Sequence, residues 1–146
     1  MNAKIVIASV LAAIAAIQFV PYGKDHTNPP VMSEPQWDSP RTKELFGRAC
    51  ADCHSHETKY PWYSNIAPVS WLVEHDIDEG REHFNVSALG IQPENETEDA
   101  AKEVREGEMP MWIYTLTHPE ERLSDGEKQE LIRGLEKTFG KEEGEE

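Results

Sequence analysis

The feature that most constrains this chain is a pair of cysteines two residues apart and followed directly by a histidine, Cys50-Ala-Asp-Cys53-His54. Two thiols at this spacing can each add to one vinyl group of a haem, and the next residue then places its imidazole under the iron. The motif therefore predicts one covalently bound haem c per chain, with Cys50 and Cys53 as attachment residues and His54 as the proximal iron ligand.

The same cysteine spacing also occurs in zinc sites, redox dithiols and disulfides. A zinc site would use Cys50, Cys53, His54 and His56, but it lacks the distant second ligand pair of a structural zinc site. A thioredoxin-like dithiol needs a strand before the motif, where a capped helix is predicted instead. A disulfide here would close a negligible loop. The haem interpretation is favoured, and a zinc-stabilised binding module is kept as an alternative.

Composition indicates a domain that folds around a cofactor. The chain has 146 residues, room for one domain of ordinary size, and 16 of its first 20 residues are apolar. Only about 31% of the other residues are apolar, which is a lean supply for a core. The net charge of −14 excludes nucleic acid as a partner. This charge suits solubility and equally suits steering toward redox proteins with basic surfaces.

Residues 1–21 are predicted to form an N-terminal hydrophobic helix that serves as a signal peptide or a membrane anchor. The apolar run Ile5–Val20 is interrupted only by Ser9 and Gln18. Counted from Met1, 20 helical residues would span about 30 Å, which is just enough for a bilayer core. The triplet Ala13-Ile14-Ala15 would serve as a cleavage site, so retention and removal both stay open. In either case the chain after Pro21 is expected to be delivered to the far side of the membrane.

Three further regions follow along the chain. Residues 22–39 are rich in proline and lack apolar periodicity, which is typical of an extended tether. Residues 40–140 carry helical patterns and are predicted to be the haem domain, and residues 141–146 are an acidic tail. Gly80 is expected to weaken the predicted helix from Val69 to His83 locally. Helices are predicted from about Pro40 to Ala49, from Val69 to His83, from Pro93 to Glu106, and after the Ser124/Glu127 capping box as far as Phe139.

A second axial ligand is predicted in the segment Gly107-Glu-Met109-Pro110. The glycine lets the chain turn sharply after a helix, and the proline restrains the segment that presents the thioether. Met109 is therefore the predicted distal ligand, and Met111 is the alternative on a slightly different loop path. His75, His83 and His118 are weaker candidates in acidic helical or turn contexts, and His56 is too near His54 to reach the opposite side of the ring.

Phe46, the Cys-x-x-Cys-His motif, the Gly-x-Met-Pro segment and Leu131-Ile132-x-x-Leu135 resemble class I c-type cytochromes. The segments from Tyr60 to Leu72 and from Met109 to Pro119 are similar, more narrowly, to the membrane-anchored bacterial haem-binding domain family. This resemblance implies an all-α, small c-type cytochrome fold of about four helices packed around one covalent haem, with His54 proximal and Met109 distal. Gly134 stands where the class usually has an aromatic residue, so a looser helix crossing, or one filled by Phe139, is expected.

The expected function is that of a mono-haem c-type cytochrome carrying single electrons on the periplasmic side of the membrane. Two strong axial ligands leave no open site for a substrate, so an electron carrier is favoured over an enzyme. The protein would be anchored in the bacterial inner membrane by residues 1–21, or soluble in the periplasm after cleavage. The alternative is a haem enzyme or gas sensor with a weak or displaceable sixth ligand. Five aromatic residues are expected to pack around the haem: Trp62, Tyr63, Trp71, Trp112 and Tyr114.

Overall fold

The computed structural model describes residues 2–93 and 95–140. In these residues the chain forms seven α-helices and three short 3-10 helices, with no strands, so the all-α prediction is confirmed. The helix count exceeds the expected four because α3 and α6 are too short to leave a periodic pattern. The elements are α1 (Ala3–Ile17), α2 (Pro40–Ala49), α3 (Ala51–His54), η1 (Trp62–Asn65), α4 (Val69–His83), η2 (Val86–Ala88), α5 (Ala100–Glu106), α6 (Trp112–Thr117), η3 (Pro119–Glu121) and α7 (Asp125–Phe139).

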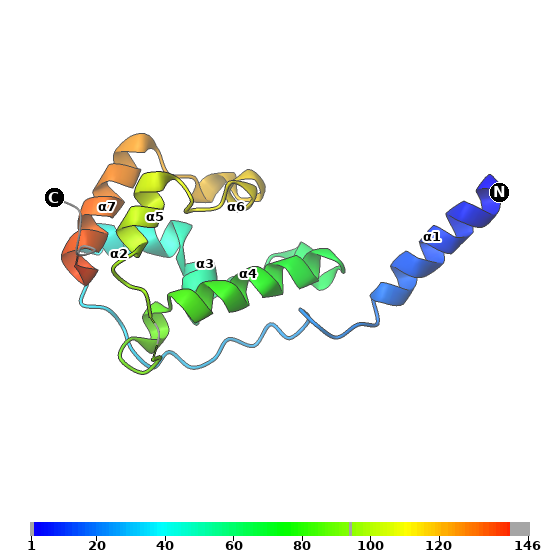
Figure 1. Ribbon diagram of the computed structural model, residues 1–146, viewed down its shortest axis with the longest axis horizontal. Helices are drawn as coiled ribbons and strands as arrows, with labels where there is room; N and C mark the ends of the chain where they lie inside the picture. The colour runs from blue at the N-terminus through cyan, green and yellow to red at the C-terminus, as the bar shows by residue number, and fades with distance from the viewer. Residues whose placement is uncertain (1, 94, 141–146) are drawn as a thin grey trace.

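Helix α1 projects away from the other helices, and none of its residues is buried (Figure 1). It ends at Ile17, three residues before the apolar run does. The next residue, Gln18, uses its side-chain amide to donate to the Ala67 carbonyl at 2.9 Å and to accept from the Ala67 N–H at 3.0 Å. Among the described residues, no helix has both the length and the apolar character needed to cross a membrane.

The helix starts predicted from capping signals are confirmed. Ser39 Oγ accepts from the Thr42 N–H at 3.1 Å, and Pro40 occupies the first turn of α2. At the start of α7 the Glu127 carboxylate accepts from the Ser124 N–H, while Ser124 Oγ accepts from the Glu127 N–H. These bonds satisfy backbone donors that have no partner inside the helix.

Helix α5 begins at Ala100, later than the predicted start near Pro93. Residues 95–99 are not helical, and the Asn95 side chain holds them by accepting from the Asn85 N–H and donating to the Asn85 carbonyl. The predicted C-terminal end is confirmed, since Gly107 follows Glu106 with a φ of 84°.

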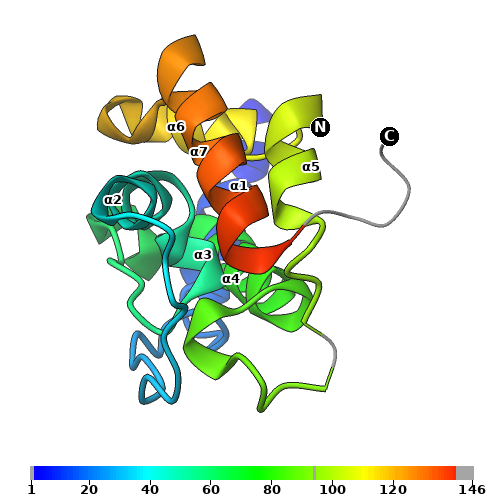
Figure 2. The same ribbon diagram turned by 90° about the vertical axis from the view of Figure 1, so that its left-hand side faces the viewer.

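The core lies where α2 and α5 pack on either side of α7 (Figure 2). Apolar stripes of these helices supply most of it, and the chain after α4 adds two residues. The buried cluster consists of Leu45, Phe46, Ala49, Phe84, Val86, Ala101, Val104, Leu123, Leu131, Ile132 and Leu135. Exclusion of these side chains from water is the main force that holds the helices together.

The crossing of α2 and α7 is tight, which corrects the expectation of a loose one. A Cβ atom on Gly134 would stand 2.0 Å from Thr42 Oγ1 and 2.6 Å from Thr42 Cγ2. The missing side chain therefore lets the two helices touch directly. Phe139 does not fill this crossing but packs edge-on against Trp37 and Phe84, at ring distances of 5.8 and 5.4 Å.

Residues 22–39, here called the strap, follow an extended path across the helical part of the chain. The Asn28 side chain donates to the Thr58 carbonyl at 2.9 Å, and the Met32 and Ser33 N–H groups both donate to the Ser87 carbonyl. Near the end of the strap Trp37 packs against the core. The strap is thus attached to the domain along its length. The predicted acidic tail, 141–146, lies outside the described residues.

Candidate functional site: a haem cavity beside the Cys-x-x-Cys-His helix

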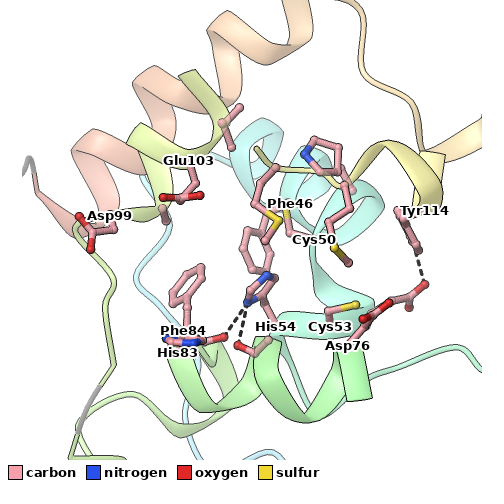
Figure 3. Close-up of a pocket in the computed structure, with 18 of the residues that line it drawn as sticks. Phe46, Cys50, Cys53, His54, Asp76, His83, Phe84, Asp99, Glu103 and Tyr114 are labelled. Carbon is pink, nitrogen blue, oxygen red and sulfur yellow. Dashed lines mark hydrogen bonds between the residues drawn. The ribbon is translucent and has the colours of Figure 1, made fainter. Parts of the chain in front are cut away.

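The Cys-x-x-Cys-His motif is itself helical. Cys50 lies at the junction of α2 and α3, and the His54 N–H donates to the Cys50 carbonyl at 3.0 Å. This single turn brings Cys50, Cys53 and His54 to one wall of a cavity of about 380 Å³ (Figure 3). Cavities of this size hold cofactors and small ligands. Both cysteines are free thiols.

The His54 ring is held by the backbone at the C-terminal end of α4. Its Nδ1 lies 3.0 Å from the Gly80 carbonyl oxygen and 2.9 Å from the Phe84 carbonyl oxygen (Figure 3). Because carbonyl oxygens only accept hydrogen bonds, Nδ1 must carry the proton. In the neutral ring Nε2 then keeps its lone pair, which is the form that binds a metal. Burial lowers the pKa of His54, and this favours that neutral form.

Gly80 has a structural role that its low helix propensity does not indicate. A Cβ atom at this position would lie 2.7 Å from the Cys53 carbonyl oxygen and 3.0 Å from Cys53 Cβ. Only glycine lets α4 approach α3 this closely while its carbonyl accepts a hydrogen bond from His54 Nδ1–H. The residue predicted to weaken α4 is therefore the contact point between this helix and the motif.

The surroundings of the two thiols argue against the redox-dithiol interpretation. Burial raises the pKa of both Cys50 and Cys53 to about 12, and the charges of Asp52 and Asp76 add to the effect at Cys53. A reactive dithiol acts through a thiolate, which these surroundings disfavour. Within the described residues, no group of three or more His, Cys, Asp or Glu side chains is placed to hold a metal ion.

Both methionines predicted as distal ligands reach the cavity. After α5 the chain turns at Gly107, and the N–H groups of Glu108 and Met109 both donate to the Glu103 carbonyl at 3.1 Å. Met109 also packs against the buried core cluster, whereas Met111 is partly buried at the start of α6. The turn thus places two thioethers in the cavity lining. Met109 is held more firmly than Met111, because it packs against the core cluster.

The histidines considered as rivals have other contacts. His83 is the one of them that lines the cavity, and its Nδ1 lies 3.2 Å from Glu96 Oε2. The other three are outside the cavity lining: His75 beside Glu79, His118 beside Tyr63, and His56 between Pro30 and Asn85.

The expected aromatic wall is largely wrong. Of the five residues, only Tyr114 lines the cavity, where its hydroxyl donates to Asp52 Oδ2 at 2.9 Å. Trp62 and Trp112 are 77% and 73% exposed. Phe46 and Phe84 supply the aromatic surface instead, and they meet edge-on at a ring distance of 5.8 Å.

A comparison with protein-family models matches residues 12–137 to the haem-binding domain family. The match covers most of the chain and includes the cysteine motif, both methionines and every helix from α2 to α6. The chain belongs to the haem-binding domain family. No curated protein and no solved structure matches it.

The residues of this haem-binding domain fit a haem. The cavity combines a histidine with an available nitrogen lone pair, two protonated thiols on the same turn, and an apolar floor. That floor is made by Phe46, Ala49, Phe84, Val104 and Leu135. An apolar surface of this kind suits the faces of a porphyrin, while the histidine supplies a ligand that iron prefers.

Carboxylates form much of the remaining lining of the haem-binding domain, and sequence reasoning did not single them out. Burial raises the pKa of Asp76, with Glu79 adding to the rise, and burial also raises the pKa of Glu103 beside Glu106 and Glu108. The sequence signal for these residues was only a high acidic content, which does not distinguish a cavity wall from a solvated surface. The lining carboxylates are Asp52, Asp76, Glu79, Glu96, Asp99 and Glu103.

Proposed function

We propose that this haem-binding domain is a mono-haem c-type cytochrome that carries single electrons. The observation that carries the proposal is the orientation of His54, whose Nδ1–H donates to the carbonyl oxygens of Gly80 in α4 and of Phe84 just after it. This arrangement prepares Nε2 as an iron ligand and fixes the ring before any metal binds.

Cys50 and Cys53 would attach the haem covalently. In each attachment the S–H bond adds across a vinyl C=C bond, so that sulfur gains a carbon and the other vinyl carbon gains the hydrogen, with no net oxidation. The raised thiol pKa values are compatible with this addition, because they keep both groups protonated until attachment. The single Cys-x-x-Cys-His motif of the sequence supports one haem c per chain.

Met109 is proposed as the distal ligand, with Met111 as the alternative. A bound haem supplies a one-electron Fe(III)/Fe(II) couple, whose potential is higher with a thioether ligand than with a second histidine. The packing of Met109 on the core would hold its thioether in place through both oxidation states. With two protein ligands occupying the iron, we propose no enzymatic activity.

Single substitutions of the two methionines test this ligand assignment. In the oxidised holoprotein, Met109→Ala should abolish the weak far-red absorption band of thioether-ligated ferric haem, and Met111→Ala should keep it. In the reduced wild type, carbon monoxide should not bind promptly at neutral pH, because the sixth position is occupied. Prompt binding would favour the alternative, a haem enzyme or gas sensor with a displaceable ligand. Loss of the band only in Met111→Ala would transfer the role to that residue.

We further propose a location facing the periplasm, with residues 1–21 attaching the protein to the bacterial inner membrane. If the segment is cleaved instead, the protein is soluble in the periplasm. The exposed apolar side chains of α1 support attachment. The proposed partners are redox proteins with basic surfaces, since the net charge of −14 would steer them. Electron exchange with a cationic partner should then slow steeply as salt is added, and an unchanged rate would contradict steering.

A further inference from the structure

A group of exposed apolar side chains surrounds the junction of α1, η1 and α4. Phe19, just after α1, is 88% exposed, and Trp62 at the start of η1 is 77% exposed. Ile66, Val69 and Leu72 are exposed as well, and Val69 and Leu72, three residues apart, lie on one side of α4. These five residues are called the η1–α4 patch.

The η1–α4 patch is fixed to the end of α1 by short contacts. The Gln18 side chain exchanges two hydrogen bonds with Ala67, between Ile66 and the start of α4. Five residues further on, Gly23 lies so close to α4 that a Cβ atom there would stand 2.2 Å from the Ser70 carbonyl oxygen. His26 then stacks on Tyr60, with ring centroids 4.2 Å apart. The patch therefore cannot move far from the point where α1 ends.

The patch also lies in an uncharged part of a strongly acidic chain. Residues 60–73 contain no Asp, Glu, Lys or Arg, although the chain carries 28 acidic residues. Lys59 precedes this segment, and Lys24 lies in the adjoining part of the strap. Residues 60–73 carry no carboxylate of their own, so anionic lipid headgroups would repel this segment less than the acidic segments along the rest of the chain.

We propose that the η1–α4 patch rests on the lipid headgroup interface of the bilayer that α1 enters. The inference depends on the proposed membrane attachment through residues 1–21. An exposed tryptophan beside apolar side chains is the composition that membrane–water interfaces favour. Because the patch adjoins the end of α1, insertion of that helix brings the patch to the lipid surface. The contact holds the haem domain in one orientation relative to the membrane.

Photolabelling of the full-length holoprotein in phosphatidylcholine vesicles tests this inference. The vesicles contain a phosphatidylcholine that carries a photoreactive group near its headgroup, and adducts are located by peptide mass spectrometry. We expect adducts on α1 and on the 60–73 segment. Adducts on α1 alone would overturn the proposed docking while leaving membrane attachment intact. The absence of adducts on α1 would overturn the membrane attachment and the docking with it.

A pair of matched variants separates docking from chance labelling. Trp62→Ser combined with Leu72→Ser should reduce adducts at Ile66 and Val69 about tenfold, because the contact loses two of its five apolar side chains, including its only tryptophan. Adducts on α1 and the visible haem spectrum should stay unchanged, which shows that the variant still folds and inserts. Unchanged labelling of Ile66 and Val69 in this variant would overturn the proposal.

The control removes two equally exposed apolar residues elsewhere, through Met32→Ser combined with Ile91→Ser. Met32 and Ile91 lie beside η2, which follows the far end of α4, about 20 Å along the helix from the patch. This variant should keep wild-type labelling of residues 60–73. An equal loss of labelling in the control would mean that general hydrophobicity explains the contact, and the proposal would fail.

Discussion

The Gly80 carbonyl oxygen lies 3.0 Å from His54 Nδ1, while the Gly80 Cα leaves no room for a Cβ beside Cys53. Gly80 thus sets the distance between α4 and the motif, and together with the Phe84 carbonyl it sets the tautomer of the histidine. The geometry of the haem site depends on the close packing of two helices as much as on the Cys-x-x-Cys-His motif.

Gly80→Ala should damage the site. The added methyl group must push α3 and α4 apart, which should cost about 1–3 kcal/mol of folding free energy and tilt the His54 ring. Thermal melting of the holoprotein and its visible spectrum measure the two effects.

The control is Gly47→Ala in α2, where a Cβ atom meets nothing within 4 Å. This change should leave the haem spectrum unchanged and should stabilise the protein by about 0.5–1 kcal/mol, since alanine is the better helix former. Equal behaviour of the two variants would contradict the role assigned to Gly80.

Gly134→Ala should destabilise the crossing of α2 and α7. Its new Cβ atom would meet three side-chain atoms of Thr42, including Oγ1 at 2.0 Å, and Thr42 is buried. We expect a loss of about 1–3 kcal/mol in denaturant unfolding. Gly126→Ala in the first turn of the same helix has open space around the added atom and should be tolerated. A stable Gly134→Ala variant would show that the crossing is looser than described.

Glu127 should make stability depend on pH in the acid range. Hydrogen bonds from the Ser124 N–H, Arg48 and the Ser124 hydroxyl lower its pKa from 4.5 to about 2. Since the folded pKa is below the unfolded one, the stabilisation is fully present above about pH 4.5 and is lost as pH falls toward 2.

Glu127→Gln should therefore lower the melting temperature at pH 7, and the difference from wild type should shrink steadily as the pH falls below 4.5. Glu98→Gln removes one acidic charge at an exposed position and serves as the control. A melting difference between Glu127→Gln and wild type that does not change with pH would contradict the ionic origin of this contribution.

Local signals in the sequence were sufficient for much of the fold. The α2 helix begins at the Ser39-Pro40 cap, α4 follows its apolar periodicity from Val69 to His83, and α7 begins at its capping box. Each of these signals acts within one helix, so the sequence of that helix is sufficient to predict where it begins or how far it extends. The main residues of the site could also be predicted from the sequence. One cavity is lined by all five of them: Cys50, Cys53, His54, Met109 and Met111.

The parts that were missed depend on contacts between distant segments. The exclusion of a Cβ at Gly80 and at Gly134 depends on how closely two helices approach, which no local pattern records. The strap was predicted as an extended tether, and its attachment to the domain depends on bonds such as that from Asn28 to the Thr58 carbonyl, 30 residues away. Trp62 and Trp112 are also exposed, although their apolar rings were expected to pack around the haem.

The most direct test of the account is the mass of the denatured full-length protein after expression in cells with haem-attachment machinery. Covalent attachment predicts that one haem mass stays with the chain through acid–acetone extraction, and that Cys50→Ser combined with Cys53→Ser removes it. A polypeptide of unmodified mass that is nevertheless folded and active, or a double variant that keeps its pigment through extraction, would contradict the account.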